Sequence, residues 1–139
     1  MNDPLANLVR TRARNRCEYC GMPQECDLFP FHIDHIIPIY HRGATIASNL
    51  ALSCWACNAH KGNQVAGVDP QTFKIVRLYH PRLHLWPYHF VYRDAYLWGK
   101  TAMGRATVES LRINLANRCN ARTEQIEEGV LFWTTQDGP

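Results

Sequence analysis

Apolar residues change their spacing along the first part of the chain, and the changes predict two different elements. After an Asp-Pro pair that suits the start of a helix, Leu5, Leu8 and Val9 recur at helical spacing. They predict a short helix over residues 4–15. Residues 31–36 instead alternate and are rich in β-branched and aromatic side chains, which predicts a strand that a following proline ends.

The central stretch predicts a second strand and a helix. Residues 39–48 form a surface loop around Gly43, and residues 50–53 form a short buried strand or extended segment. A short helix begins near Asn58, and Gly62 weakens its end. The resulting order of strand, loop, strand and helix is a ββα unit.

The second half of the chain predicts mixed structure. Residues 73–79 fit a strand or a helix, residues 89–93 alternate as a strand does, and apolar positions in residues 107–115 keep helical spacing. A last helix runs to Glu128 and ends at Gly129. Aromatic rings of the segment before it are interpreted as core, with base stacking as the alternative. These rings belong to Trp86, Tyr88, Phe90, Tyr92, Tyr96 and Trp98.

Composition and charge narrow the class of protein. The 139 residues, 46% of them hydrophobic, suit one small domain whose thin core gains from a bound metal. The chain starts without the basic and apolar run of a signal peptide and has no apolar stretch of about eighteen residues, so we expect a cytoplasmic protein without a membrane span. The net charge of +3 is mildly basic. Arginines before the first cysteine pair form either a solvated helix face or a phosphate-facing stripe: Arg10, Arg12, Arg14 and Arg16.

Four cysteines form two Cys-x-x-Cys pairs, Cys17 with Cys20 and Cys54 with Cys57. In the cytosol such pairs bind metal more often than they form disulfides. Four thiolates complete the tetrahedron that zinc prefers and leave no open coordination position. We therefore predict a structural zinc held by two zinc knuckles, with coincidental buried thiols as the alternative. The two remaining cysteines are interpreted as free thiols.

Other side chains of the central stretch suit the hydrolysis of a phosphodiester. Asp34 stands beside His35, Asn49 follows a loop, and Asn58 comes directly after the second cysteine pair. Hydrolysis needs an activated water and stabilisation of the charge that develops on oxygen. Histidine titrates near neutral pH and can serve as the base, whereas carboxylate and amide oxygens suit Mg²⁺. Neighbouring strand residues point to opposite faces, so we expect Asp34 and His35 to divide these tasks.

These residues resemble the motif of the HNH endonucleases, which are ββα-metal nucleases. The match runs in order through Cys17-x-x-Cys20-Gly21, Asp34-His35-Ile36-Ile37-Pro38, Gly43, Asn49-Leu50 and Cys54-x-x-Cys57-Asn58-x-x-Lys61-Gly62. It covers residues 12–63, and a looser likeness to a bacterial subgroup covers residues 81–111. The resemblance implies an α+β fold with a single domain over residues 1–139. Within it we expect a ββα-metal core at about residues 12–65, two zinc knuckles, flanking helices and a C-terminal α/β extension at about residues 70–135.

The resemblance also implies roles for individual residues. His35 is similar to the general base that activates water, and Asn49 to the residue that orients this base. Asp34 and Asn58 are similar to the ligands of a catalytic divalent ion, Mg²⁺ or Mn²⁺, and Lys61 to a lysine near phosphate. The family motif has histidine or asparagine in the slot of Asn58. The implied products carry a 5′-phosphate and a 3′-hydroxyl.

The partner implied by the resemblance is nucleic acid, above all double-stranded DNA. The candidate contacts to it are cationic or imidazole side chains: Lys61, Arg42, His41, Arg12, Arg14 and Arg16. His60 is a weaker candidate for the metal, because it lies about 200° from Asn58 around a helix. Two alternatives to a metal-dependent endonuclease stay open: a non-catalytic zinc-ribbon module that binds nucleic acid, and a degenerate nuclease kept as a scaffold.

Overall fold

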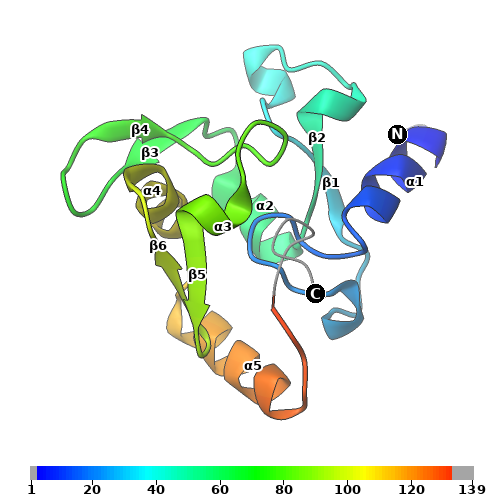
Figure 1. Cartoon of the computed structure of the whole chain (residues 1–139). Coiled ribbons are helices and arrows are strands. Elements are labelled where there is room, and N and C mark those ends of the chain that lie inside the picture. The colour runs from blue at the N-terminus through cyan, green and yellow to red at the C-terminus, as the bar shows by residue number, and fades with distance from the viewer. Residues whose placement is uncertain (1–2, 133–139) are drawn as a thin grey trace.

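The computed structural model describes residues 3–132 and shows helices around three antiparallel two-stranded hairpins (Figure 1). The strands are β1 (His32–His35), β2 (Leu50–Ser53), β3 (Ala66–Val68), β4 (Ile75–Arg77), β5 (Phe90–Arg93) and β6 (Tyr96–Gly99). The helices are α1 (Asp3–Arg12), α2 (Trp55–Lys61), α3 (Trp86–His89), α4 (Ala102–Ser110) and α5 (Ala116–Glu127). No helix in this part of the chain is long and apolar enough to cross a membrane. The α+β class is confirmed.

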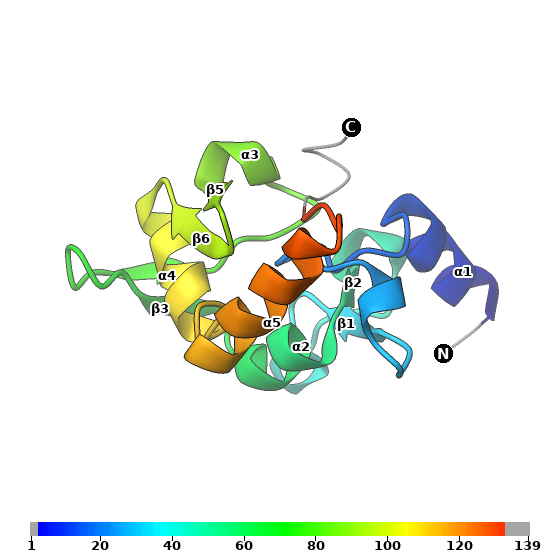
Figure 2. The same ribbon diagram turned by 90° about the horizontal axis from the view of Figure 1, so that it is seen from below.

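The first hairpin and the helix that follows it form the predicted ββα unit. β1 pairs with β2 so that Asp34 lies opposite Ala51 and His35 lies opposite Leu50. Every residue of β2 is buried, and the chain passes from β2 through Cys54 directly into α2. Figure 2 shows α2 lying against the two strands. The predicted order of strand, loop, strand and helix is confirmed.

The start of α2 differs from the prediction for a reason that lies in the zinc knuckle. α2 begins at Trp55 rather than near Asn58. Cys54 is its N-cap, and its sulfur accepts the backbone N–H of Cys57 at 3.4 Å. A predicted zinc ligand therefore also sets the start of the helix that carries Asn58.

Three elements in the second half of the chain could not be fully predicted from the spacing of apolar residues. α4 begins ahead of the predicted start at residue 107, because Thr101 Oγ1 accepts the N–H of Gly104 at 3.0 Å and caps the helix. α3 is a single turn, too short for a periodic pattern. Residues 73–79, which fitted a strand or a helix, contain β4.

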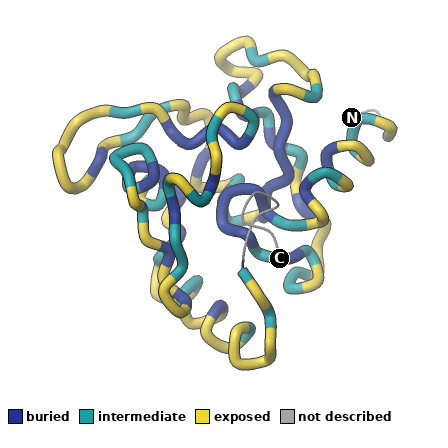
Figure 3. Tube along the Cα trace, viewed as in Figure 1, coloured by how far each residue is buried: buried dark blue, intermediate teal, exposed yellow. Residues whose placement is uncertain are grey.

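The core joins the first half of the chain to the aromatic segment around α3, and its buried residues stand out in Figure 3. Trp86 is buried, and its Nε1 donates to the backbone oxygen of Tyr19 at 2.9 Å. Phe90 packs beside it, with ring centroids 5.3 Å apart. The interpretation of the aromatic rings as core is therefore confirmed for these two. It is wrong for three rings that are exposed: Tyr88, Tyr96 and Trp98.

Candidate active site and zinc centre

The four paired cysteines come together in one buried cluster. Cys17, Cys20, Cys54 and Cys57 are all buried, and their sulfurs lie within 4.8 Å of one another. Sulfurs around a tetrahedral zinc at about 2.3 Å stand about 3.8 Å apart, and Cys20 Sγ lies 3.8 Å from Cys54 Sγ. The donor set and its spacing fit one zinc ion with no open position, so the ion would stabilise the fold without taking part in chemistry.

The surroundings of this cluster suit the negative charge of a zinc bound by four thiolates. Nη2 of Arg118, on α5, lies 3.1 Å from Cys57 Sγ. Burial disfavours the charge of Arg118, yet the nearby cysteines outweigh this and raise its pKa above the usual range. The N–H of Cys20 also points at Cys17 Sγ, at 3.5 Å. Arg118 was not predicted, because nothing in its local sequence marks it as a neighbour of the thiols.

The two residues inside the first knuckle connect the zinc centre to the ββα unit. Glu18 Oε2 accepts the N–H of Leu52 at 2.8 Å, and Arg82 forms an ion pair with the same carboxylate. The hydroxyl of Tyr19 donates to Asp34 Oδ2 at 2.7 Å. The knuckle therefore fixes β2 and, through a single hydroxyl, the acid of the candidate active site.

A surface cleft of about 330 Å³ brings three of the predicted site residues together. Asp34 and His35 line it from the end of β1, and Asn58 lines it from α2. The remaining walls come from β1, from the loop after β1 and from the residues that follow α2: Ile33, Pro38, Ile39, Tyr40, Gly62 and Asn63. The ββα unit thus brings Asp34, His35 and Asn58 to the wall of one cleft.

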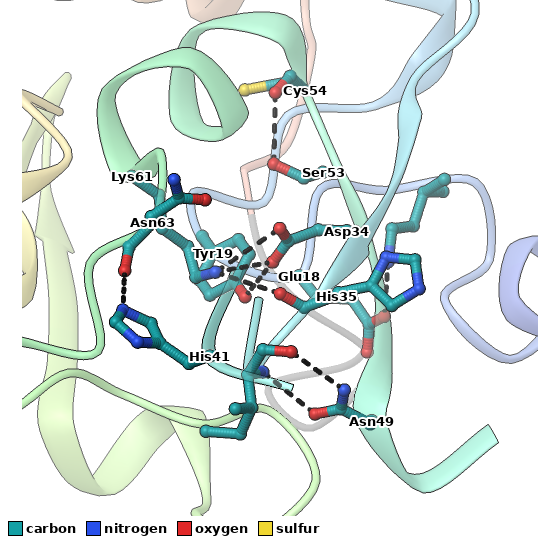
Figure 4. A network of polar contacts seen from close by, with 12 residues as sticks. Glu18, Tyr19, Asp34, His35, His41, Asn49, Ser53, Cys54, Lys61 and Asn63 are labelled. Atoms are coloured by element: carbon teal, nitrogen blue, oxygen red, sulfur yellow. Dashed lines mark hydrogen bonds and ion pairs between the residues drawn. The ribbon is translucent and has the colours of Figure 1, made fainter. Parts of the chain in front are cut away.

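Asp34 is buried in the wall of this cleft, and its carboxylate accepts hydrogen bonds from Tyr19 and Lys61. Its side chain is 8% exposed, and Lys61 Nζ lies 3.2 Å from Oδ2 (Figure 4). Lys61 is itself 2% exposed and also donates to the backbone oxygen of His35 at 3.2 Å. Burial raises the pKa of Asp34, while Lys61 and Tyr19 work in the opposite direction. The prediction placed Lys61 at phosphate, but the structure places its ammonium in the interior as the counter-ion of Asp34.

Removing this ammonium should weaken the fold. In Lys61→Met the buried carboxylate of Asp34 loses its counter-ion, which typically costs about 3–5 kcal/mol of unfolding free energy. The loss should be largest at neutral pH. It should shrink as the pH falls through the raised pKa of Asp34, because the protonated acid needs no counter-ion. Urea unfolding at several pH values measures this, with exposed Lys100→Met expected to stay within about 0.5 kcal/mol of wild type. Equal stability of the two variants would contradict the role given to Lys61.

His35 presents its ring on the other side of β1. In Figure 4 the imidazole and the carboxylate of Asp34 extend in opposite directions, as neighbouring strand residues do. The Nε2 atom of His35 lies 2.8 Å from Thr45 Oγ1, in the loop that follows the strand. Thr45 was not predicted, since a lone threonine in a loop gives no pattern.

Asn49 is buried and holds the loop that follows His35. Its Nδ2 donates to the backbone oxygens of Ile37 and Ala44 at 3.0 and 2.9 Å, and its Oδ1 accepts the N–H of Ile37 at 2.9 Å. Gly43 lies in the same loop, where an added Cβ would stand 1.7 Å from Ile37 O. The amide therefore acts on the backbone around the predicted base and does not touch the imidazole.

The donor geometry at Asn49 gives a direct test. Asn49→Asp replaces two N–H donors with an oxygen that faces two carbonyl groups, so we expect a loss of about 3 kcal/mol in the free energy of unfolding. Chemical denaturation measures the loss, and Asn120→Asp on the exposed face of α5 is the control. If the two variants unfold at the same denaturant concentration, Asn49 is not the clamp of this loop.

The predicted contacts to nucleic acid do not share one environment. Arg12 donates to the backbone oxygens of Ala47 and Leu50, and Arg16 donates to that of Gly21. These two side chains support the fold around the zinc knuckle. Three others are exposed: His41, Arg42 and Arg14. The Nε2 atom of His41 lies 2.9 Å from the backbone oxygen of Asn63, which lines the cleft. His60 lines a different cavity, formed with α4, in line with its expected separation from Asn58.

The buried four-cysteine cluster, the ββα unit and the cleft lie within one segment that a sequence comparison also singles out. Residues 17–64 match the family model described as HNH endonuclease. The matched segment extends from the first zinc ligand to just beyond α2 and contains all the residues predicted for catalysis. No curated protein and no solved structure matched the chain.

Proposed function

We propose that the chain is a metal-dependent endonuclease that hydrolyses phosphodiester bonds in double-stranded DNA. The observation that carries this proposal is that Asp34, His35 and Asn58 all line one cleft within the segment that matches the HNH model. The choice of DNA as substrate follows from the resemblance of the motif.

His35 is proposed as the general base. Because Nε2 meets the Thr45 hydroxyl, the tautomer with its proton on Nε2 lets that atom donate to Thr45. The Nδ1 atom then carries the free lone pair that takes the proton of the attacking water. Asn49 supports this geometry by holding the backbone on the C-terminal side of His35.

Asp34 and Asn58 are proposed to hold a divalent cation, Mg²⁺ or Mn²⁺. A carboxylate and an amide oxygen on one cleft suit such an ion, which keeps several waters in its shell. When bound, the ion would stabilise negative charge on the phosphate and the departing 3′-oxygen. Tyr19 orients the Asp34 carboxylate from the far side, and Lys61 balances its charge.

The test is a cleavage assay on supercoiled plasmid DNA with the zinc-loaded protein and a series of Mg²⁺, Mn²⁺ and Ca²⁺ concentrations. We expect nicked or linear products with Mg²⁺ or Mn²⁺ and none after their removal. Binding of DNA without cleavage under every metal condition would instead support the non-catalytic zinc-ribbon module.

A further inference from the structure

The hairpin of β3 and β4 carries an exposed apolar tip, which we define as Phe73, Ile75 and Val68. Their exposed fractions are 80%, 78% and 48%. Figures 1 and 2 both show the loop of this hairpin projecting from the body of the protein, and Figure 3 shows it exposed. The tip leaves much apolar surface in water, while the strands of the hairpin pack against α4.

The loop that presents Phe73 is firmly built around the buried residue Asp69. Its carboxylate accepts the N–H of Gln71 at 3.1 Å and the hydroxyl of Thr72 at 2.8 Å. Arg105, on α4, donates to both carboxylate oxygens at 2.9 Å, and the same pairing holds the pKa of Asp69 below its usual range. The turn is therefore anchored to the body of the protein by a two-pronged ion pair.

Phe73 itself adopts an unfavourable backbone conformation. Its φ is 63°, in the left-handed region where bulky side chains are disfavoured. The N–H of Phe73 donates to Asp69 O at 2.7 Å, and the N–H of Asp69 donates to Lys74 O at 2.9 Å, which hold it there. Strain of this kind persists where the surrounding structure imposes it and often marks a functional contact. Here the strained backbone of Phe73 holds an aromatic ring exposed to solvent.

The charge around the apolar tip is positive. Lys74 and Arg77 are exposed and take part in no ion pair within residues 3–132. Asp69 is neutralised by Arg105. The cavity beside Ile75 contains one acid, Glu109, together with the cationic Arg112. Cations beside an apolar wedge suit a partner with phosphates around stacked bases.

The tip is also within reach of DNA bound at the cleft. Asn63 lines the cleft, and ten residues of chain connect it to Phe73. At no more than about 3.6 Å per residue these span at most about 36 Å, or about ten base pairs of duplex.

We propose that Phe73 inserts between two base pairs of the duplex that lies in the cleft, within about ten base pairs of the cut, while Lys74 and Arg77 contact the flanking phosphates. The inference rests on the proposed function for the identity of the substrate. It adds a DNA-distorting contact outside the matched segment, which ends at residue 64.

The experiment uses the zinc-loaded full chain without Mg²⁺ or Mn²⁺, and duplexes with 2-aminopurine placed at successive positions. This base fluoresces more strongly when it is unstacked, so wild type should brighten the probe at saturation. Phe73→Gly should leave it dark and bind roughly tenfold more weakly, since one stacked base contributes about that much. Its melting temperature should not fall, because glycine relieves the left-handed strain.

The matched control is Phe29→Ala, which removes a ring that is 73% exposed but lies in another loop, beside Trp55. It should bind and brighten the probe as wild type does. A wild type that cuts plasmid but leaves every probe position dark overturns the insertion of Phe73 alone, and so does wild-type affinity in Phe73→Gly. A wild type that neither binds nor cuts DNA overturns the proposed function as well.

Discussion

His35→Ala should lower the rate of plasmid cleavage by about 10²–10⁴-fold while leaving the protein folded and zinc-loaded. A factor of this size is typical for the loss of a general base. Within residues 3–132 the side chain of His35 forms a hydrogen bond to Thr45, in an exposed loop, so its removal should barely change stability. Single-turnover cleavage, zinc content and the melting temperature measure the three parts of this expectation.

The matched control is His32→Ala, because His32 lies on the same strand and is exposed. It should cut at the wild-type rate. Added imidazole should restore part of the activity of His35→Ala, which a merely structural role would not allow. Full activity of His35→Ala would contradict the assignment of His35 as the general base.

Loss of the zinc centre should unfold the domain. Structural zinc contributes about 10–16 kcal/mol of apparent binding free energy in small peptides, and a whole domain is stable by about 5–15 kcal/mol. Cys54→Ser removes one ligand and the N-cap of α2 together. We expect it to lose bound zinc and its cooperative thermal transition, measured by metal analysis and circular dichroism.

The control for the zinc centre is Cys26→Ser, because Cys26 lies outside the four-thiol cluster. This variant should keep its zinc and melt as wild type does. A cooperative transition in Cys54→Ser at the wild-type temperature would show that the cluster is not what holds the fold together.

Several features of the fold could be predicted because local rules govern them. The Cys-x-x-Cys spacing identifies the thiol cluster without knowledge of the fold, because a spacer of two residues lets both thiolates of a pair reach one ion. The alternation of residues 31–36 and the buried run at residues 50–53 correctly predict β1 and β2. Helix starts were missed where a side chain caps the helix, as Cys54 and Thr101 do.

The partners of the site residues could not be predicted, because they come from distant parts of the chain. Tyr19, Lys61 and Asp34 lie apart in sequence, and only the folded ββα unit brings the three together. The family motif gave Lys61 a place near phosphate, whereas burial in the structure makes it an internal counter-ion. Arg118 reaches Cys57 from the last helix, across 61 positions of sequence.

The position of Tyr19 limits how this domain could be rebuilt. Tyr19 sits between two of the clustered cysteines, and its hydroxyl donates a hydrogen bond to Asp34. A chimaera that exchanged the knuckle for one from another zinc protein would keep the metal yet leave the acid without its hydroxyl partner. Such grafts should therefore retain a tyrosine at this position, because the same short segment supplies two thiols of the cluster and the hydroxyl that orients Asp34.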